Sequence, residues 1–209
     1  MPFLGISDLW LFAAAVTVFV LLPGPGMLSL LSASARGGWR AGGATWAGLV
    51  AGEQVFIAAA ALGVAAALSG HPLLFALLQW AGVAYLGWIG LSLLRAPAHA
   101  PHASAAPARN AGDFANGVAV SLLNPKAIGF YVAFFPLFID PATQRGVLTF
   151  LAMDAVILGI SLAFSAALVG AGQWGARRLA AHPHWALRLR RGAGLCLLGF
   201  ALRLALTVH

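Results

Sequence analysis

Two prolines and two glycines interrupt the first apolar stretch of the chain, and this interruption limits the possible folds more than any other feature. Pro23, Gly24, Pro25 and Gly26 stand inside a run that otherwise reads as one membrane-crossing helix. A proline inside a helix removes a backbone donor, and its ring collides with the carbonyl four residues earlier. In hydrocarbon such a break is tolerated only where protein or a wet cavity satisfies the freed backbone groups. We therefore expect a broken helix whose break faces the inside of a bundle.

A break of this kind has two interpretations. Interrupted membrane helices indicate the binding sites of transporters. The alternative is a packing kink, because proline and glycine are more frequent in membrane helices than in soluble ones. A single proline would favour the packing kink, whereas four such residues in succession make the two interpretations about equal, and both stay open.

The composition places the chain in a membrane. Of its 209 residues, 61% are hydrophobic and only 8% are charged, which excludes the charged surface of a soluble globular protein. The single Cys196 excludes a disulfide framework and a thiolate metal site, and we expect no cofactor. A helix needs about 20 residues to cross a core of about 30 Å. We predict an all-α integral membrane fold with six transmembrane helices, near 9–34, 44–68, 73–94, 114–139, 147–172 and 192–208.

The basic residues predict an orientation rather than a nucleic-acid partner. The formal net charge is +7, from twelve Lys and Arg against five Asp and Glu. Most of the positive charges lie in loops that follow the first, third and fifth helices, and positively charged loops remain cytoplasmic. Both termini are then expected outside. The residues concerned are Arg36, Arg40, Arg95, Arg109, Arg177, Arg178, Arg188, Arg190 and Arg191.

A linker divides the predicted single domain, residues 1–209, into two halves. Residues 96–112 are rich in alanine, proline and histidine, which is typical of a semi-extended linker. His99 and His102 within it are interpreted as solvated residues rather than metal ligands, because no cysteine or carboxylate lies beside them. The half-repeats are about 1–95 and 113–209.

The second half repeats landmarks of the first in the same order. Asn124-Pro125-Lys126 interrupts the fourth run, as the prolines and glycines interrupt the first. Glu53 and Asp154, one acid in the second run and one in the fifth, follow the two breaks at nearly equal separations. Two halves of three helices must have opposite orientations in a membrane. We predict two inverted three-helix repeats, an architecture of many secondary transporters, with helices 1 and 4 broken at Pro and Gly.

Three charges near mid-membrane need a role. A charged residue at a helix centre costs about 2.5–3.5 kcal/mol on insertion scales, and Glu53 and Asp154 are both expected about 11 to 14 Å deep at 1.5 Å per residue. An acid there can carry a proton through a transport cycle. Lys126 is a natural partner for one of the acids or for a substrate carboxylate. The alternative is a purely structural ion pair between Lys126 and an acid.

The two breaks together suit a zwitterionic solute. At a helix break, free N–H groups favour an anion and free carbonyls favour a cation. We predict a substrate site built from both interruptions. Its residues are Pro23, Gly24, Pro25, Gly26, Asn124, Pro125 and Lys126, with Glu53 and Asp154 as candidate proton-coupling acids. The glycines at 48, 52, 82, 87, 90 and 199 are interpreted as close-packing positions.

These residues resemble the LysE/RhtB family of amino acid exporters. The resemblance covers nearly the whole chain and includes Leu22-Pro23-Gly24-Pro25, Ala81-Gly82-Val83-Ala84-Tyr85-Leu86, Asn124-Pro125-Lys126-Ala127 and Phe138-Ile139-Asp140-Pro141. It implies a bacterial inner-membrane protein with six helices that expels amino acids or related small metabolites by proton exchange. The chain departs from the family at Gly26, where members usually carry Asp or Asn. The first break therefore lacks a side-chain ligand.

The function that these observations predict is secondary efflux of an amino acid-like, amphoteric solute, most simply by proton antiport. The partners are the solute and the lipid bilayer, and assembly as a homo-oligomer is compatible with the sequence. One alternative is export of a metal cation, for which two separate acids without histidine or thiolate form a poor cage. Another is a membrane enzyme or assembly factor, but the sequence shows no nucleophile beside a base and no phosphate-binding loop.

Overall fold

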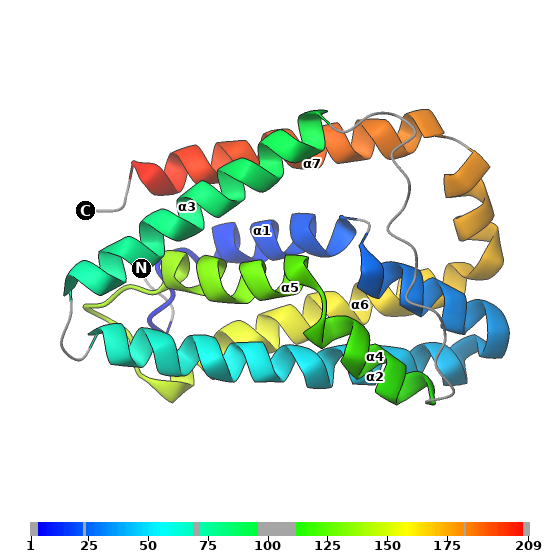
Figure 1. The fold of residues 1–209 in the computed structure, drawn as a ribbon, viewed down its shortest axis with the longest axis horizontal. Helices are drawn as coiled ribbons and strands as arrows, with labels where there is room; N and C mark the ends of the chain where they lie inside the picture. Colours follow the sequence, from blue (N-terminus) through cyan, green and yellow to red (C-terminus); the bar gives the residue numbers. More distant parts are fainter. Residues whose placement is uncertain (1–3, 23, 69–71, 96–111, 182, 207–209) are drawn as a thin grey trace.

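Helices form every named element in the part of the chain that the computed structural model describes, residues 4–22, 24–68, 72–95, 112–181 and 183–206. They lie side by side along one long axis (Figure 1). Outside the helices, an isolated antiparallel β-bridge pairs Ile6 with Ile139. The elements are α1 (Leu9–Leu21), α2 (Pro25–Leu68), α3 (Pro72–Arg95), α4 (Asp113–Leu122), α5 (Pro125–Gly129), the π-helix η1 (Phe130–Phe134), the 3₁₀-helix η2 (Phe135–Phe138), α6 (Val147–Ala181) and α7 (Pro183–Ala205).

Element α2 consists of two arms joined by a sharp turn. Gly37 and Gly38 have non-helical backbone angles, and Gly38 adopts φ 58° and ψ −143°, a conformation that glycine reaches without strain. The two arms fold back on each other, since a Cβ built on Gly42 would lie 2.5 Å from the Ser34 hydroxyl. The first predicted run is thus α1 followed by the first arm, and the second predicted run is the second arm.

Apart from the two breaks and residues 139 and 206, helical structure covers the described residues of all six predicted runs, and some helices are longer than expected. Element α6 continues to Ala181, and α7 begins at Pro183, so the predicted loop 173–191 is helical apart from residue 182, which lies outside the described residues. The linker 96–112, with His99, His102 and Arg109, also lies outside them except for Gly112. Within the described ranges, two segments are long and apolar enough to cross a membrane, Pro25–Val64 and Val147–Ala171, while Leu9–Leu21 is apolar but shorter. The six-span arrangement stays a prediction.

Glycines set the closest helix crossings. A Cβ on Gly48 of α2 would collide with the backbone of Phe114 in α4, and one on Gly52 would lie 2.6 Å from the Ser121 Cβ. In the same way Gly90 of α3 lies against Gly194 of α7. The packing role predicted for the glycines at 48, 52 and 90 is confirmed. It is wrong for those at 87 and 199, where an added Cβ would meet no atom of the described residues within 4 Å.

The core is a column of aromatic rings between α1 and the η1–η2 segment. Phe12 contacts the rings of Phe134 and Phe138 at centroid distances of 5.8 and 5.2 Å, and Phe19 stacks on Phe130 at 4.0 Å. Aromatic pairs at these separations contribute beyond their buried area. This column holds the end of α1 beside the segment that follows the second break.

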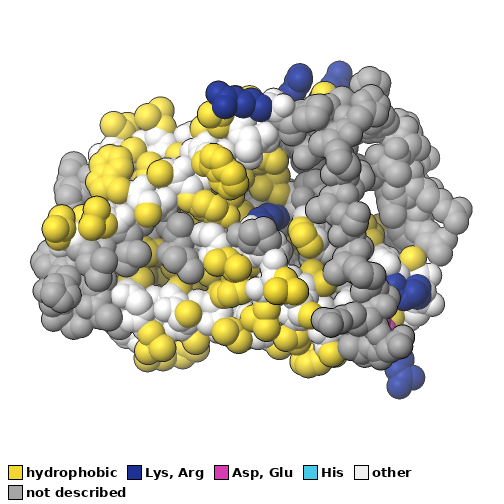
Figure 2. Space-filling model, in the orientation of Figure 1, with side chains coloured by type: hydrophobic (Ala, Val, Ile, Leu, Met, Phe, Trp, Pro, Cys, Tyr) yellow, Lys and Arg dark blue, Asp and Glu magenta, His cyan; other side chains and the backbone are white. Residues whose placement is uncertain are grey.

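The surface is apolar outside this core. Large hydrophobic side chains are exposed on several helices, among them Trp10, Leu62 and Trp88 at 84%, 73% and 66%. Figure 2 shows hydrophobic side chains over much of the described part of one face, with positive side chains mainly at its edges. So much exposed apolar surface is not stable in water and is expected for a helical membrane protein.

The two ends of the described chain lie at the same end of the bundle. The start of α1 and the end of α7 are both on the left of Figure 1, opposite the turn at Gly37–Gly38. A salt bridge of 2.7 Å joins Asp8, which caps α1, to Arg203 in the last turn of α7. Because both side chains are exposed, this pair adds little stability.

Candidate functional site

The first helix is broken where the sequence predicted. Element α1 ends at Leu21, Leu22 is extended with φ −68° and ψ 121°, and α2 begins at Pro25. Pro23 lies outside the described residues. A proline at the first position of a helix costs no backbone hydrogen bond, because an N–H at this position would have no intrahelical acceptor. The break therefore exposes the last carbonyls of α1 and the first N–H groups of α2.

The second predicted break is also present. Element α4 ends at Leu122, and α5 begins at Pro125. Asn124 is extended, as expected for a residue before proline, and its side-chain oxygen accepts a hydrogen bond of 3.1 Å from the Lys126 N–H. Asn124 is thus the N-cap of the helix that follows. The π-helix and 3₁₀-helix beyond it were not predicted, and π-bulges are frequent at functional sites.

Lys126 joins the two breaks. Its ammonium donates hydrogen bonds to the carbonyls of Phe19 and Leu22, at 2.8 and 2.9 Å, and lies 4.4 Å from the centre of the Phe19 ring. These carbonyls belong to the C-terminus of α1, where a cation is stabilised by the unpaired C=O groups. Tyr85 of α3 donates to the Lys126 carbonyl at 3.3 Å. Breaks that are about 100 residues apart in sequence are therefore in contact.

Lys126 does not form an ion pair with Glu53 or Asp154, although an acid was one of the two partners predicted for it. In the part of the chain that the structure describes, the ion pairs within 4.0 Å are Arg36–Asp113 and Arg203–Asp8. Backbone carbonyls take the place of an acid. The Leu22 carbonyl follows the end of α1 and has no intrahelical donor, and the Phe19 carbonyl accepts both from Lys126 and from the Leu22 N–H at 3.3 Å. The purely structural pair between Lys126 and an acid is not observed.

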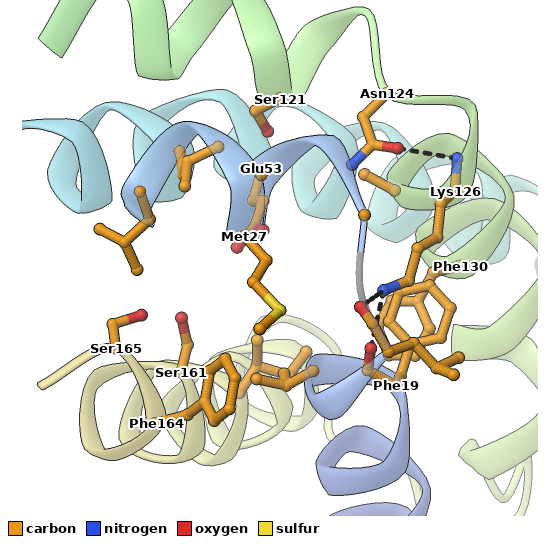
Figure 3. A pocket seen from close by; sticks show the side chains of 18 of the residues that line it. Phe19, Met27, Glu53, Ser121, Asn124, Lys126, Phe130, Ser161, Phe164 and Ser165 are labelled. Atoms are coloured by element: carbon orange, nitrogen blue, oxygen red, sulfur yellow. Dashed lines mark hydrogen bonds between the residues drawn. The ribbon is translucent and has the colours of Figure 1, made fainter. Parts of the chain in front are cut away.

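A partly open cavity of about 110 Å³ lies between the breaks (Figure 3). A single water needs only about 10–15 Å³, so this space admits a small solute. Five predicted site residues line it, and these are Gly24, Gly26, Asn124, Lys126 and Glu53. The other wall is largely apolar and includes Val16, Leu30, Leu49, Ile157 and Phe164.

The two candidate acids occupy different places. Glu53 lines the cavity together with Tyr131, whereas Asp154 accepts a hydrogen bond of 3.1 Å from Gln54 and is not among the cavity-lining residues. The two acids lie on neighbouring helices, because Gln54, the residue that follows Glu53 in α2, donates this hydrogen bond to Asp154 of α6. Pro25 does not line the cavity, and the side chain of Pro125 lies outside the described ones.

Several polar residues of the cavity were not predicted from the sequence. Ser121 lies one helical turn before Asn124, and Tyr131 lies in the π-helix that follows. On the facing wall, Ser161 of α6 accepts a hydrogen bond of 3.1 Å from the Trp46 side chain, and Ser165 lies one turn further along. Serines and aromatic residues are common in membrane helices, so their residue types alone do not indicate a site. The only sequence signal that could have identified Ser121 and Tyr131 is their short distance from the second break.

The comparisons with known proteins agree with this arrangement. A family model described as LysE type translocator matches residues 17–207. A membrane protein of Pseudomonas aeruginosa is 36% identical over 98% of both chains. Two proteins named leucine efflux protein, from an Enterobacter species and from Klebsiella pneumoniae, are 32% and 30% identical over 96% of both chains. No solved structure matches. This chain, with two broken helices that meet at one cavity, belongs to the LysE type translocator family.

Proposed function

We propose that this protein is a secondary transporter that exports amino acids with apolar side chains across the bacterial inner membrane. The observation that carries the proposal is the single cavity that residues of both helix breaks line, Gly24 and Gly26 from one and Asn124 and Lys126 from the other. Helix breaks that meet at a cavity are typical of transporter sites near mid-membrane.

The lining of the cavity supports a zwitterionic substrate with an apolar side chain. A carboxylate is attracted by the Lys126 ammonium, and an ammonium group is attracted by Glu53. The apolar wall, with Ile157 and Phe164, suits an aliphatic side chain. Two relatives are named leucine efflux proteins, so leucine is the first solute to test. The same lining suits a metal cation poorly, because Glu53 is its only carboxylate among the described residues.

The architecture proposed for this function has six membrane spans in two inverted halves, about 1–95 and 113–209, of a single domain. Its support is the pairing of corresponding elements. Element α3 packs against α7 through Gly90 and Gly194, and the second arm of α2 contacts α6 through Trp46 and Ser161 and through Gln54 and Asp154. Alternating access would rock one half against the other. The arginine loops then face the cytoplasm, and both termini face outward.

We further propose that proton antiport drives export, with Glu53 and Asp154 as the coupling acids. Glu53 lines the cavity, so its carboxylate can exchange a proton for the substrate ammonium during the cycle. Asp154 is held next to the same stretch of α2, because it accepts a hydrogen bond from Gln54, the residue after Glu53. Acids within membrane helices often serve as proton relays.

Export by intact bacteria tests the function. Cells that overproduce the protein are loaded with a leucine-containing dipeptide, and leucine in the medium is measured over time. We expect faster leucine export than from cells with an empty vector, and a loss of at least about tenfold with Asn124→Ala, which removes the cap and a cavity-lining amide. Ser92→Ala, on α3 and away from the cavity, serves as the matched control. Equal export of leucine and of other amino acids from all four strains would contradict the proposal.

A further inference from the structure

A buried hydroxyl group in the cavity has no partner. Ser121 of α4 is 1% exposed, and its Oγ has no hydrogen-bond partner among the described residues. A buried polar group without a partner costs about 1–3 kcal/mol by general estimates, so such a group in a native protein calls for an explanation. Thr45 is the other buried hydroxyl group without a partner in the described chain, but it does not line the cavity.

The fold places this hydroxyl beside the acid of the cavity. Ser121 packs on Gly52, where an added Cβ would lie 2.6 Å from the Ser121 Cβ and 2.9 Å from its Oγ. Gly52 immediately precedes Glu53 in the second arm of α2. Figure 3 shows the Ser121 hydroxyl pointing toward Glu53 at the cavity. A close helix crossing thus places the Ser121 hydroxyl and the Glu53 side chain on the same side of the cavity.

Hydrogen-bond donors, which attract an anionic group, lie on the other side of the cavity. Lys126 has three N–H donors, and two of them are used for the carbonyls of Phe19 and Leu22. No acceptor is seen for the third among the described residues. Gly26 lies in the first turn of α2, whose N–H groups have no intrahelical acceptors and attract anions.

We propose that Ser121 is a substrate-binding residue that receives, together with Glu53, the ammonium group of the exported amino acid. The substrate carboxylate is then directed to Lys126 and the N-terminus of the first arm of α2, and its side chain lies against the apolar wall. This inference rests on the proposed function and adds to it an orientation of the substrate and a residue that selects for the ammonium group.

Binding to the purified full-length protein tests the orientation. Affinities are measured by competition with radiolabelled L-leucine for three unlabelled probes: leucine, 3-methylbutylamine, which lacks the carboxylate, and 4-methylpentanoate, which lacks the ammonium group. With Ser121→Ala we expect leucine and 3-methylbutylamine to bind about tenfold more weakly, the usual effect of losing one hydrogen bond to a charged group. The affinity for 4-methylpentanoate should change by less than about twofold. Ser92→Ala should leave all three unchanged.

Thermal unfolding of the same samples separates binding from folding. Because Ser121→Ala removes an unpaired buried hydroxyl without adding volume, the variant should melt at the same temperature as the wild type or higher. A lower melting temperature, or equal weakening of all three probes, would assign Ser121 a structural role and overturn the inference. Unchanged affinity for leucine would overturn it as well, while the proposed function would stand. Failure of the wild-type protein to bind leucine would count against the proposed function and this inference together.

Discussion

The crossing of α2 and α4 at Gly48 is expected to be the most sensitive packing contact near the site. A Cβ at this position would lie 2.9 Å from the carbonyl carbon of Phe114 and 3.0 Å from the Val118 nitrogen, and closer still to the Phe114 oxygen. All three atoms belong to the backbone, so no side chain can rotate away, and α4 must move by at least about 1 Å to restore ordinary contact with the Phe114 oxygen. Overpacking of this kind costs about 1–3 kcal/mol.

Gly43 provides the matched control for Gly48→Ala. It lies in the same arm of α2, and an added Cβ there would meet no atom within 4 Å in the described part of the chain. Gly43→Ala should be neutral or stabilise by about 0.5–1 kcal/mol, the intrinsic gain of alanine over glycine in a helix. The difference between the two variants then isolates the helix contact.

Thermal unfolding in detergent, followed by circular dichroism, measures this difference. At about 2–4 °C per kcal/mol for a chain of this size, Gly48→Ala should melt about 2 to 12 °C below Gly43→Ala. Leucine binding by Gly48→Ala should also weaken, because α4 carries Ser121 and ends at the second break. Equal melting temperatures for the two variants would refute the close crossing, and with it the physical reason that Ser121 lies beside Glu53.

Two further predictions concern the charged residues. Lys126→Met removes the ammonium donor to the Phe19 and Leu22 carbonyls and leaves the Phe19 carbonyl only the Leu22 N–H. Because one unsatisfied buried carbonyl costs about 1–3 kcal/mol, we expect a lower melting temperature and at least about tenfold slower leucine export. An unchanged melting temperature would contradict the capping role. Glu53→Gln and Asp154→Asn should each abolish leucine transport driven by a pH gradient in proteoliposomes, although Asn at 154 can still accept the hydrogen bond from Gln54 and so should not disturb packing. Normal transport by both variants would remove the proton-relay role.

The positions of the two breaks could be predicted from the sequence because proline acts locally. The ring of Pro25 or Pro125 prevents a regular helix in any surroundings, and the structure interrupts the helices at Leu22 and Asn124. The helical class of the fold followed from long apolar runs for a similar reason, since a backbone in lipid must satisfy its own hydrogen bonds. Neither prediction required knowledge of which helices meet.

The partners across the site could not be predicted in this way. An ammonium in a membrane protein can be bound either by a carboxylate or by free carbonyls, and the hydrogen bonds of Lys126 to Phe19 and Leu22 depend on the packing of α5 beside the end of α1. The separation of Glu53 from Asp154 likewise depends on the rotation of two helices about their axes, so one acid lines the cavity and the other contacts Gln54. Sequence separation contains no information on that rotation.

The sequence by itself determined where the helices break, how apolar the chain is and which charges lie within its apolar runs, because each depends on covalent geometry or on transfer from water to lipid. Only the tertiary structure decided that the two breaks enclose one cavity and that Ser121 lies beside Glu53 in it. Those relations depend on the close approach of helices at Gly48 and Gly52, where the absence of a side chain lets α2 and α4 meet. Such an approach is a property of two surfaces together, and neither surface specifies it alone.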